Sequence, residues 1–286
     1  MKALLNVVST ALLLAPALAW SQAAVVEGVQ MPAWVERGGA RTPLSPGMQL
    51  RQGDQLRTGG GSRLLLRLSE GSMVKLGENA SLRVTELSPT KELFKGALAV
   101  LEGAFRFTTT ALGVNKRRDI NINVATVTAG VRGTDLWGKS VPTRQVVCLI
   151  EGKIEVGAPG ETPVALDQSR QFYQRVNDQT QPVGFVEPAQ LGEWAKETEI
   201  EAGKGAARSG GRFRVELAAA DNQNDALAVY DQFRAAGYAA EIRPLKVEDK
   251  LVYRVQIRNL PSRAEAQALA NQLKGRFGVA EPRAAG

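Results

Sequence analysis

Between residues 63 and 84 the chain repeats short apolar or alternating runs that are separated by glycine-containing breaks. The runs are Arg63–Leu68, Ser72–Leu76 and Ser81–Val84, and the breaks are Glu70-Gly71 and Gly77-Glu78-Asn79. Successive side chains of a strand point to opposite faces, so runs of this length and pattern predict strands joined by tight turns. With 29 glycines and 13 prolines in 286 residues, the composition also favours short strands over long helices.

The Glu-Gly pair recurs further along the chain, at Glu102-Gly103 and at Glu151-Gly152, each time between alternating apolar residues. Glycine reaches the positive φ that a tight hairpin turn needs, so we expect a hairpin at each pair. Evenly spaced short strands of this kind fit a sandwich, a roll or a short solenoid. The sequence therefore predicts an all-β domain over residues 27–187 and leaves its topology open among these three.

The chain contains no histidine and only one cysteine, Cys148. This excludes Ser-His-Asp and Cys-His nucleophiles, His-ligated zinc, an internal disulfide and a multi-cysteine metal cage. Cys148 lies in an apolar run typical of a strand, which predicts a buried and unreactive thiol. We therefore expect no catalytic residue, no metal and no cofactor.

Carboxylate pairs can hydrolyse glycans without histidine, and Glu102 and Glu151 are the candidates for such a pair. Nothing in the sequence brings two of the Glu-Gly carboxylates together in a desolvated pocket. We therefore predict that they are solvated turn residues. A cell-wall hydrolase therefore stays a functional hypothesis that no motif supports.

The N-terminus has the three parts of a secretory signal peptide. Lys2 supplies a positive charge, residues 3–14 form an apolar segment, and Ala17-Leu18-Ala19 matches a cleavage site. The apolar segment is shorter than the roughly 20 residues that span a bilayer, so we expect cleavage after Ala19 rather than a retained anchor. No later stretch has the length and apolarity of a membrane span, which predicts an exported protein without a transmembrane segment.

The formal charge of +7 and the isoelectric point of 9.7 favour an anionic neighbourhood. Nucleic acid, anionic lipid and cell-wall polymer all have the required charge. Because the chain is expected to be exported, we expect no nucleic-acid partner.

Four motifs follow one another in a characteristic order: Gly53–Gly59, Arg63–Leu68 with its Glu70-Gly71-Ser72 turn, Val131–Thr134, and Glu151–Val156. In this order they resemble the FecR domain family, over about residues 47–172. Known members include the periplasmic part of membrane-bound regulators of iron-uptake sigma factors, where the domain receives a signal from an outer-membrane receptor. This chain shows neither an anti-sigma segment nor a spanning helix. The resemblance therefore implies an extracytoplasmic, β-rich binding or scaffold module.

Within the Val-Arg-Gly-Thr motif of this resemblance, Arg132 and Thr134 have two possible roles. In the structural role, Gly133 allows an unusual backbone turn and Arg132 pairs locally. In the other role, these residues contact a ligand directly. We favour the structural role.

Residues 188–211 differ in composition from the segments on either side. They begin with a polar, helix-favouring pattern and end in a stretch rich in glycine, alanine and serine. We expect a short helix whose Leu191 and Trp194 pack back on the β domain. The stretch that follows is expected to be a flexible linker.

Residues 212–282 alternate strand and helix patterns. The strand patterns are Phe213–Leu217, Ala240–Pro244 and Val252–Arg258, with a short last strand expected near Val279. One helix is predicted over 222–236 and ends at Gly237, and a capping box of Ser262 and Glu265 opens a second. The order β-α-β-β-α-β predicts a ferredoxin-like α+β domain. The fold class is thus two-domain, all-β followed by α+β.

One sequence pattern occurs twice in this domain: an aromatic residue, Arg, Val, Glu or Gln, and Leu or Ile. It occurs at Phe213–Leu217 and at Tyr253–Ile257, each time before a helix that starts with an acidic residue and alanine. This repeated pattern resembles that of the SPOR domain family, over about residues 212–282. That family binds peptidoglycan glycan strands stripped of their stem peptides and gathers at division sites, with ligand contacts from the open face of the sheet. By alternation, the residues predicted on this face, and so to bind glycan, are Arg214, Glu216, Arg254, Gln256 and Arg258.

Arginine suits such a ligand, because the guanidinium group donates several hydrogen bonds to hydroxyls, carboxylates and amide carbonyls. The sequence therefore predicts a non-catalytic periplasmic protein that binds denuded peptidoglycan and presents a FecR-like module, in cell-wall or division-site organisation. The alternative is an envelope signalling scaffold whose FecR-like module binds a partner protein.

Overall fold

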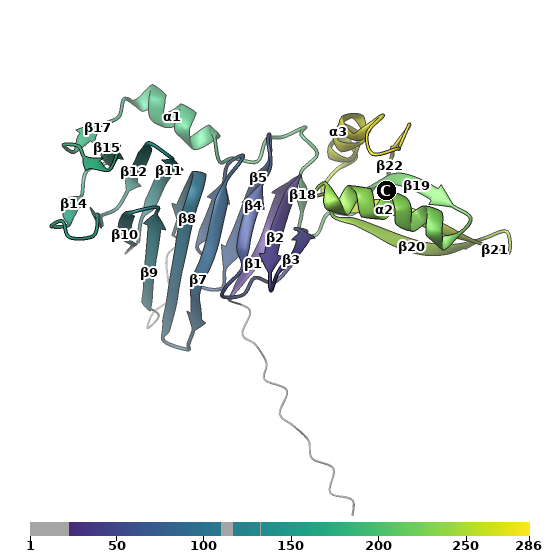
Figure 1. Cartoon of the computed structure of the whole chain (residues 1–286), viewed down its shortest axis with the longest axis horizontal. Helices are drawn as coiled ribbons and strands as arrows, with labels where there is room; N and C mark the ends of the chain where they lie inside the picture. The colour runs from purple at the N-terminus through teal and green to yellow at the C-terminus, as the bar shows by residue number, and fades with distance from the viewer. Residues whose placement is uncertain (1–22, 110–116, 132) are drawn as a thin grey trace, which may run out of the picture.

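The computed structural model describes residues 23–109, 117–131 and 133–286. The expected signal peptide, residues 1–19, and the motif residue Arg132 lie outside the described residues. Across the described ranges, no helix has both the length and the apolarity needed to span a bilayer. Strands dominate the N-terminal part, and a smaller domain with two helices follows at the C-terminus (Figure 1).

The strands of the N-terminal part, here called the β domain, form two stacked layers joined through one long strand, β8 (Leu93–Thr108). Layer A has the order β18 (Ala207–Arg208), β1 (Ala24–Gln30), β5 (Arg63–Leu68), β6 (Met73–Leu76), the second half of β8, β11 (Asp135–Val141), β12 (Arg144–Glu151) and β15 (Gln171–Val176), with β16 (Gln179–Thr180) and β17 (Gly184–Phe185) beyond it. Layer B has the order β3 (Ala40–Pro43), β2 (Ala33–Arg37), β4 (Gln55–Thr58), β7 (Ser81–Pro89), the first half of β8, β9 (Arg117–Val124), β10 (Val127–Val131), β13 (Ile154–Gly157) and β14 (Val164–Leu166). Of the topologies that the sequence left open, this is the sandwich.

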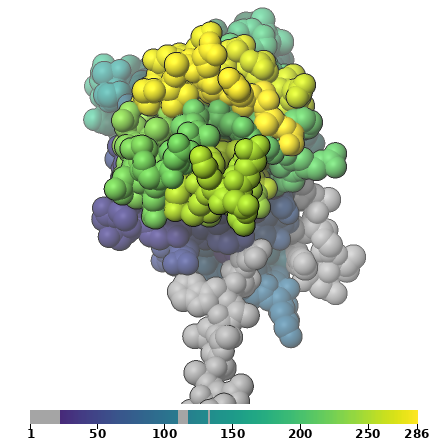
Figure 2. Space-filling model, turned by 90° about the vertical axis from the view of Figure 1, so that its right-hand side faces the viewer, coloured from purple at the N-terminus to yellow at the C-terminus, as the bar shows by residue number. Residues whose placement is uncertain are grey.

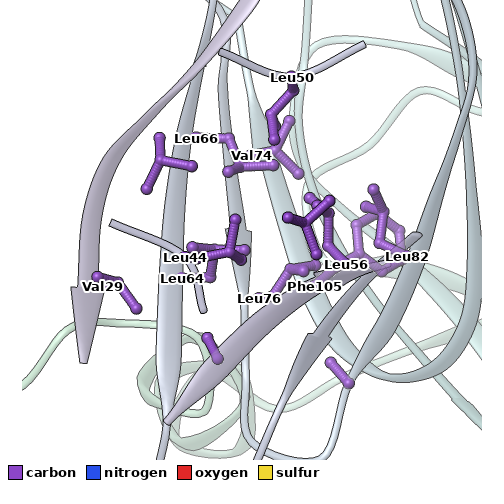
Figure 3. Close-up of a cluster of buried hydrophobic side chains, with 14 of the residues drawn as sticks. Val29, Leu44, Leu50, Leu56, Leu64, Leu66, Val74, Leu76, Leu82 and Phe105 are labelled. Atoms are coloured by element: carbon purple, nitrogen blue, oxygen red, sulfur yellow. The ribbon is translucent and has the colours of Figure 1, made fainter. Parts of the chain in front are cut away.

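The apolar core lies between the two layers (Figure 3). Leu64 and Leu66 of β5 and Phe105 of β8 meet Leu56 of β4 and Leu82 of β7, and each of these side chains is at most 1% exposed. Burying a side chain of this size contributes about 1.5–3 kcal/mol. The alternation along Arg63–Leu68 thus identified a strand that faces the core on one side.

Of the three Glu-Gly pairs, the first forms the expected hairpin, because β5 pairs with β6 around Glu70-Gly71. The hairpins predicted at the other two are wrong. Gly103 lies inside β8, and Gly152 joins β12 of layer A to β13 of layer B. At both glycines the chain crosses between the layers with a positive φ, of 85° and 96°. A Cβ at either position would lie within 2.6 Å of a backbone atom, so only glycine fits there. The Glu-Gly pairs at these two places therefore mark crossings between the layers and not hairpin turns.

The C-terminal domain follows the predicted β-α-β-β-α-β order. Its elements are β19 (Phe213–Ala220), α2 (Gln223–Ala235), β20 (Ala240–Val247), β21 (Lys250–Leu260), α3 (Arg263–Leu273) and β22 (Arg283–Ala285), with the sheet order β20-β21-β19-β22. The side chains of Asn222 and Ser262 cap the two helices, each accepting a hydrogen bond from the backbone three residues on. The last strand begins at Arg283 instead of near Val279, because positive φ angles at Gly275, Phe277 and Gly278 first turn the chain.

Helix α1 (Pro188–Lys196) packs on the outer face of layer A, as predicted (Figure 1). The ring of Trp194 stacks on Trp137 of β11, with 4.6 Å between the centroids, and meets Phe172 of β15 edge-on. Leu191 belongs to the same apolar cluster. The helix therefore fixes where the connection to the C-terminal domain begins.

The segment that follows α1 lies on layer A and carries three acidic residues, at every second position, that pair with basic residues of the layer. Glu197 pairs with Lys139 of β11 at 2.8 Å, Glu199 with Arg106 of β8 at 3.1 Å and with Lys75 of β6, and Glu201 with Arg63 of β5 at 3.6 Å. Each partner lies on a different strand of layer A. Hydrogen bonds to Asp135 raise the pKa of Arg106 further. The segment thus lies across the sheet and is held by charge.

The stretch expected to be a flexible linker is also held by both domains. β18 pairs with β1, and the backbone N–H groups of Gly203, Gly205 and Ala206 donate to the carboxylate of Glu265 at 2.7 to 3.2 Å. Composition describes the intrinsic stiffness of a segment and carries no information on such tertiary partners. Glu265, predicted as the second half of a capping box, therefore ties the connecting segment to α3.

Candidate functional site

The predicted glycan-binding residues lie on β19 and β21, the two central strands of the C-terminal sheet. Val215 and Ile257 on these strands are buried in the core. Side chains alternate along each strand, so Glu216 and Gln256, which are direct cross-strand partners, belong to the opposite face. The pairing places these residues on the predicted face, but the prediction that Gln256 is open to a ligand is wrong, because its neighbours cover it to 1% exposure.

Three of the five residues form one cluster. Arg214 Nε donates a hydrogen bond to Glu216 Oε1 at 3.1 Å, and Arg214 Nη2 and Arg254 Nη1 each form an ion pair with the same oxygen at 3.0 Å. All three side chains are about a quarter exposed. Two guanidinium groups share one carboxylate, which leaves the cluster with a net positive charge at the surface.

The other two residues gather around a carboxylate that sequence reasoning missed. Gln256 Nε2 donates to Glu241 Oε1 of β20 at 2.7 Å, and Arg258 Nε lies 3.6 Å from the same oxygen. Gln256 is 1% exposed, whereas half of the Arg258 side chain is exposed. Alternation along the predicted strand Ala240–Pro244 is the signal that could have placed Glu241 on this face.

Both carboxylates orient the arginines more than they stabilise the fold. Ion pairs at such partly exposed positions contribute about 0–1 kcal/mol each. A ligand that brings its own hydroxyl, carboxylate or carbonyl acceptors can therefore compete for the guanidinium donors at small cost. Chemically, the face is a row of oriented donors for an oxygen-rich ligand.

In Figure 2 the C-terminal domain, coloured green to yellow, lies in front of the β domain. The two domains make contact just before β20, the second strand of the C-terminal domain. The backbone N–H of Ala33 donates to Gly237 O at 3.1 Å, and that of Ala239 donates to the sulfur of Met31 at 3.4 Å. Gly237 lies so close to Trp34 that a Cβ would be 2.5 Å from its ring. The face described above is thus held at a defined place beside layer B.

In the Gly53–Gly59 motif of the FecR resemblance, the aspartate Asp54 has a structural role. Asp54 is fully buried, and Arg37 donates to its two oxygens at 2.6 and 2.7 Å, which raises the pKa of Arg37. The backbone N–H of Arg51 donates to the same carboxylate.

At the Val-Arg-Gly-Thr motif, Gly133 adopts the unusual turn that was predicted, with a φ of 76°, and Thr134 is buried.

Cys148 is buried in β12, as predicted, and desolvation raises the pKa of its thiol to about 12. The reactive species towards disulfide reagents and alkylating agents is the thiolate. At pH 8 we therefore expect no labelling by a disulfide reagent in the folded protein and complete labelling in 8 M urea. Fast labelling of the folded protein would show that the thiol is accessible and ionised.

Glu102 and Glu151, the candidates for a hydrolytic pair, both occupy exposed positions. A general acid of a glycosidase needs a desolvated site that raises its pKa. The structure provides no such site around either carboxylate, in agreement with the prediction that both are solvated.

Comparison with known families identifies both parts of the chain. Residues 54–155 match the family model described as FecR protein, and residues 209–281 match the model described as SPOR domain. The chain therefore carries a FecR region followed by a SPOR domain, in the order expected from its motifs. SPOR domains bind peptidoglycan, and FecR-like domains take part in envelope signalling.

Solved structures add a distant likeness. Two crystal structures of a protein from Parabacteroides distasonis ATCC 8503, described as a candidate anti-sigma factor, were determined at 1.65 and 2.50 Å resolution. They are 16% and 15% identical to this chain, each with a TM-score of 0.41, and cover 77% of this chain and 89% of their own. No curated protein matches the chain.

Proposed function

We propose that this chain is a non-catalytic periplasmic protein that binds denuded glycan strands of peptidoglycan with the open face of its SPOR domain. The observation that carries the proposal is the gathering of Arg214, Arg254 and Arg258 on this face, each beside a carboxylate that orients it. Export with cleavage after Ala19 would deliver it to the periplasm. There it would present its FecR region to an envelope protein, in cell-wall or division-site organisation.

The predicted residues take different roles in this proposal. Arg254 and Arg258 contact the ligand, because only part of their donor capacity is directed at Glu216 and Glu241. Glu216 orients both arginines of its cluster. Gln256 is covered by its neighbours and is a positioning residue that holds Glu241.

Replacing Arg254 with alanine should weaken binding of the full chain to amidase-treated sacculi about tenfold. Hydrogen bonds from a charged group contribute about 1.5–3 kcal/mol, and 1.4 kcal/mol corresponds to a factor of ten. Co-sedimentation over a range of protein concentrations measures the effect, with untreated sacculi as the comparison substrate. Binding should be stronger to the treated sacculi.

The matched control is Lys274→Ala, which removes one positive charge from an exposed side chain just beyond α3, 66% exposed. This variant should bind like the unchanged chain. If both variants lost affinity equally, and if all binding disappeared at high salt, the attraction would be one of net charge and the proposed face would be wrong.

A further inference from the structure

A cavity of about 190 Å³ lies between the two domains, next to the proposed glycan face. Thr42 of β3 and Ser45 of the following turn line it from the β domain. Glu241 of β20 and Arg258 and Asn259 of β21 line it from the SPOR domain. Neither domain alone would enclose this space.

The cavity and the proposed face share two residues. Glu241 and Arg258, which form the second carboxylate cluster of the face, also line the cavity. β21 carries Arg254 on the face and Arg258 at the cavity, four residues apart. A linear ligand bound along β21 at Arg254 and Arg258 therefore extends toward the cavity, because Arg258 belongs to both the face and the cavity lining.

The lining combines polar and apolar groups in the way that a sugar ring requires. Hydroxyls of Thr42 and Ser45 and the charged groups of Arg258 and Glu241 offer hydrogen bonds to ring substituents. Pro43, Pro46, Met31 and Met48 supply apolar surface for the C–H face of a ring. Pockets for whole drug-sized ligands measure about 300–1,000 Å³, so this smaller cavity has room for one ring of a longer chain.

We propose that this cavity is a subsite for one sugar residue of the glycan strand that the SPOR face binds. The FecR region then takes part in glycan binding directly, and the two domains form one composite site. The inference rests on the proposed function of the SPOR face and extends it across the domain boundary.

The contacts between the domains keep both walls of the cavity in place. The hydrogen bond from Ala239 to the Met31 sulfur joins two lining residues from opposite domains, and the hydrogen bond from Ala33 to Gly237 O lies two residues away along each chain segment. The carboxylate of Glu265 in α3 accepts hydrogen bonds from the backbone of Gly203 and Gly205 and so holds the segment that connects the two domains. A subsite of this kind binds without the cost of ordering two separate domains.

Two variants in the β domain test the subsite without altering the SPOR domain. Ser45→Phe fills the cavity, and Thr42→Val removes one hydroxyl while keeping the shape of the side chain. Binding of the full-length protein to purified amidase-released glycan strands is measured by calorimetry. We expect about tenfold weaker binding for Ser45→Phe and about threefold weaker binding for Thr42→Val, since the loss of one neutral hydrogen bond is worth about 0.5–1.5 kcal/mol. The control is Ser88→Phe, at an exposed position of β7, which should bind unchanged.

The outcomes separate the subsite from the proposed function. Absence of binding by the unchanged chain would refute glycan binding as a whole, and with it the subsite. Normal binding by the unchanged chain and by both variants would overturn the subsite alone. If Ser45→Phe lowered the melting temperature, the shape-preserving Thr42→Val would decide, and an affinity equal to that of the unchanged chain would count against the inference.

Discussion

Replacing Arg37 with methionine should lower the free energy of unfolding by about 1–3 kcal/mol, the cost of leaving a buried acceptor without its partner. The Arg37 side chain is itself 36% exposed, so the cost stays below that of breaking a fully buried ion pair. Asp54 is fully buried, and Arg37 is the cation that donates to both of its oxygens. Without it, the carboxylate keeps the backbone N–H of Arg51 as a donor but has lost its counter-charge. Urea denaturation followed by circular dichroism measures the loss.

Two further variants isolate the cause of this loss. Arg67→Met removes an arginine that is 55% exposed and pairs with Glu27 at 3.0 Å, so it should cost less than about 1 kcal/mol. The double variant Arg37→Met with Asp54→Asn should regain part of the lost stability, because asparagine removes the buried charge and keeps an oxygen acceptor for the backbone N–H of Arg51. A double variant as unstable as Arg37→Met alone would show that packing, and not charge, explains the effect.

This ion pair also shows where sequence reasoning ends. The Gly-Asp motif drew attention to Asp54, but its partner Arg37 lies on β2, 17 residues earlier. The pattern around Arg37 resembles that of any half-exposed strand. Which arginine meets the buried carboxylate depends on the pairing of β2 with β4, which is a property of the sheet and not of either segment.

The candidate site was predictable to a similar depth. Alternation placed Arg214, Glu216 and Arg254 on one face, because the period of a strand is local information. The second cluster required the register between β20 and β21, which sets Glu241 opposite Gln256. The cavity beyond it required the docking of two domains. Each of these steps depends on contacts that are more distant in sequence than the last.

The segment after α1 is held by ion pairs that its composition does not predict. The stretch after α1 has the glycine content of a flexible linker, yet Glu197, Glu199 and Glu201 before it pair with basic residues on four strands of layer A. Glu197 and Glu199 lie in the turns that continue α1, where Glu197 N donates to Trp194 O and Glu199 N to Lys196 O, so no strand-like alternation marks them in the sequence. Without the positions of the basic partners, their spacing predicts no contact.

Replacing Gly237 with alanine should weaken the docking of the SPOR domain on the β domain, because the new methyl group would meet the Trp34 ring. Gly237 has a φ of 88°, which costs a residue with a Cβ about 1–2 kcal/mol. The new methyl group would also lie 2.5 Å from the Trp34 ring, and such overpacking costs about 1–3 kcal/mol. We expect a lower melting temperature and a larger radius of gyration by X-ray scattering, because separating the domains relieves the clash.

Gly275→Ala is the matched control, since Gly275 has a φ of 73° but nothing within 4 Å of its Cβ position. It incurs the backbone cost alone and should leave the radius of gyration unchanged. The difference between the two variants therefore measures the interdomain contact. If Gly237→Ala separates the domains, its glycan affinity should fall to that of Ser45→Phe, because both changes remove the composite cavity and leave the SPOR face intact. A separated variant that binds glycan at full strength would show that the β domain contributes nothing to recognition.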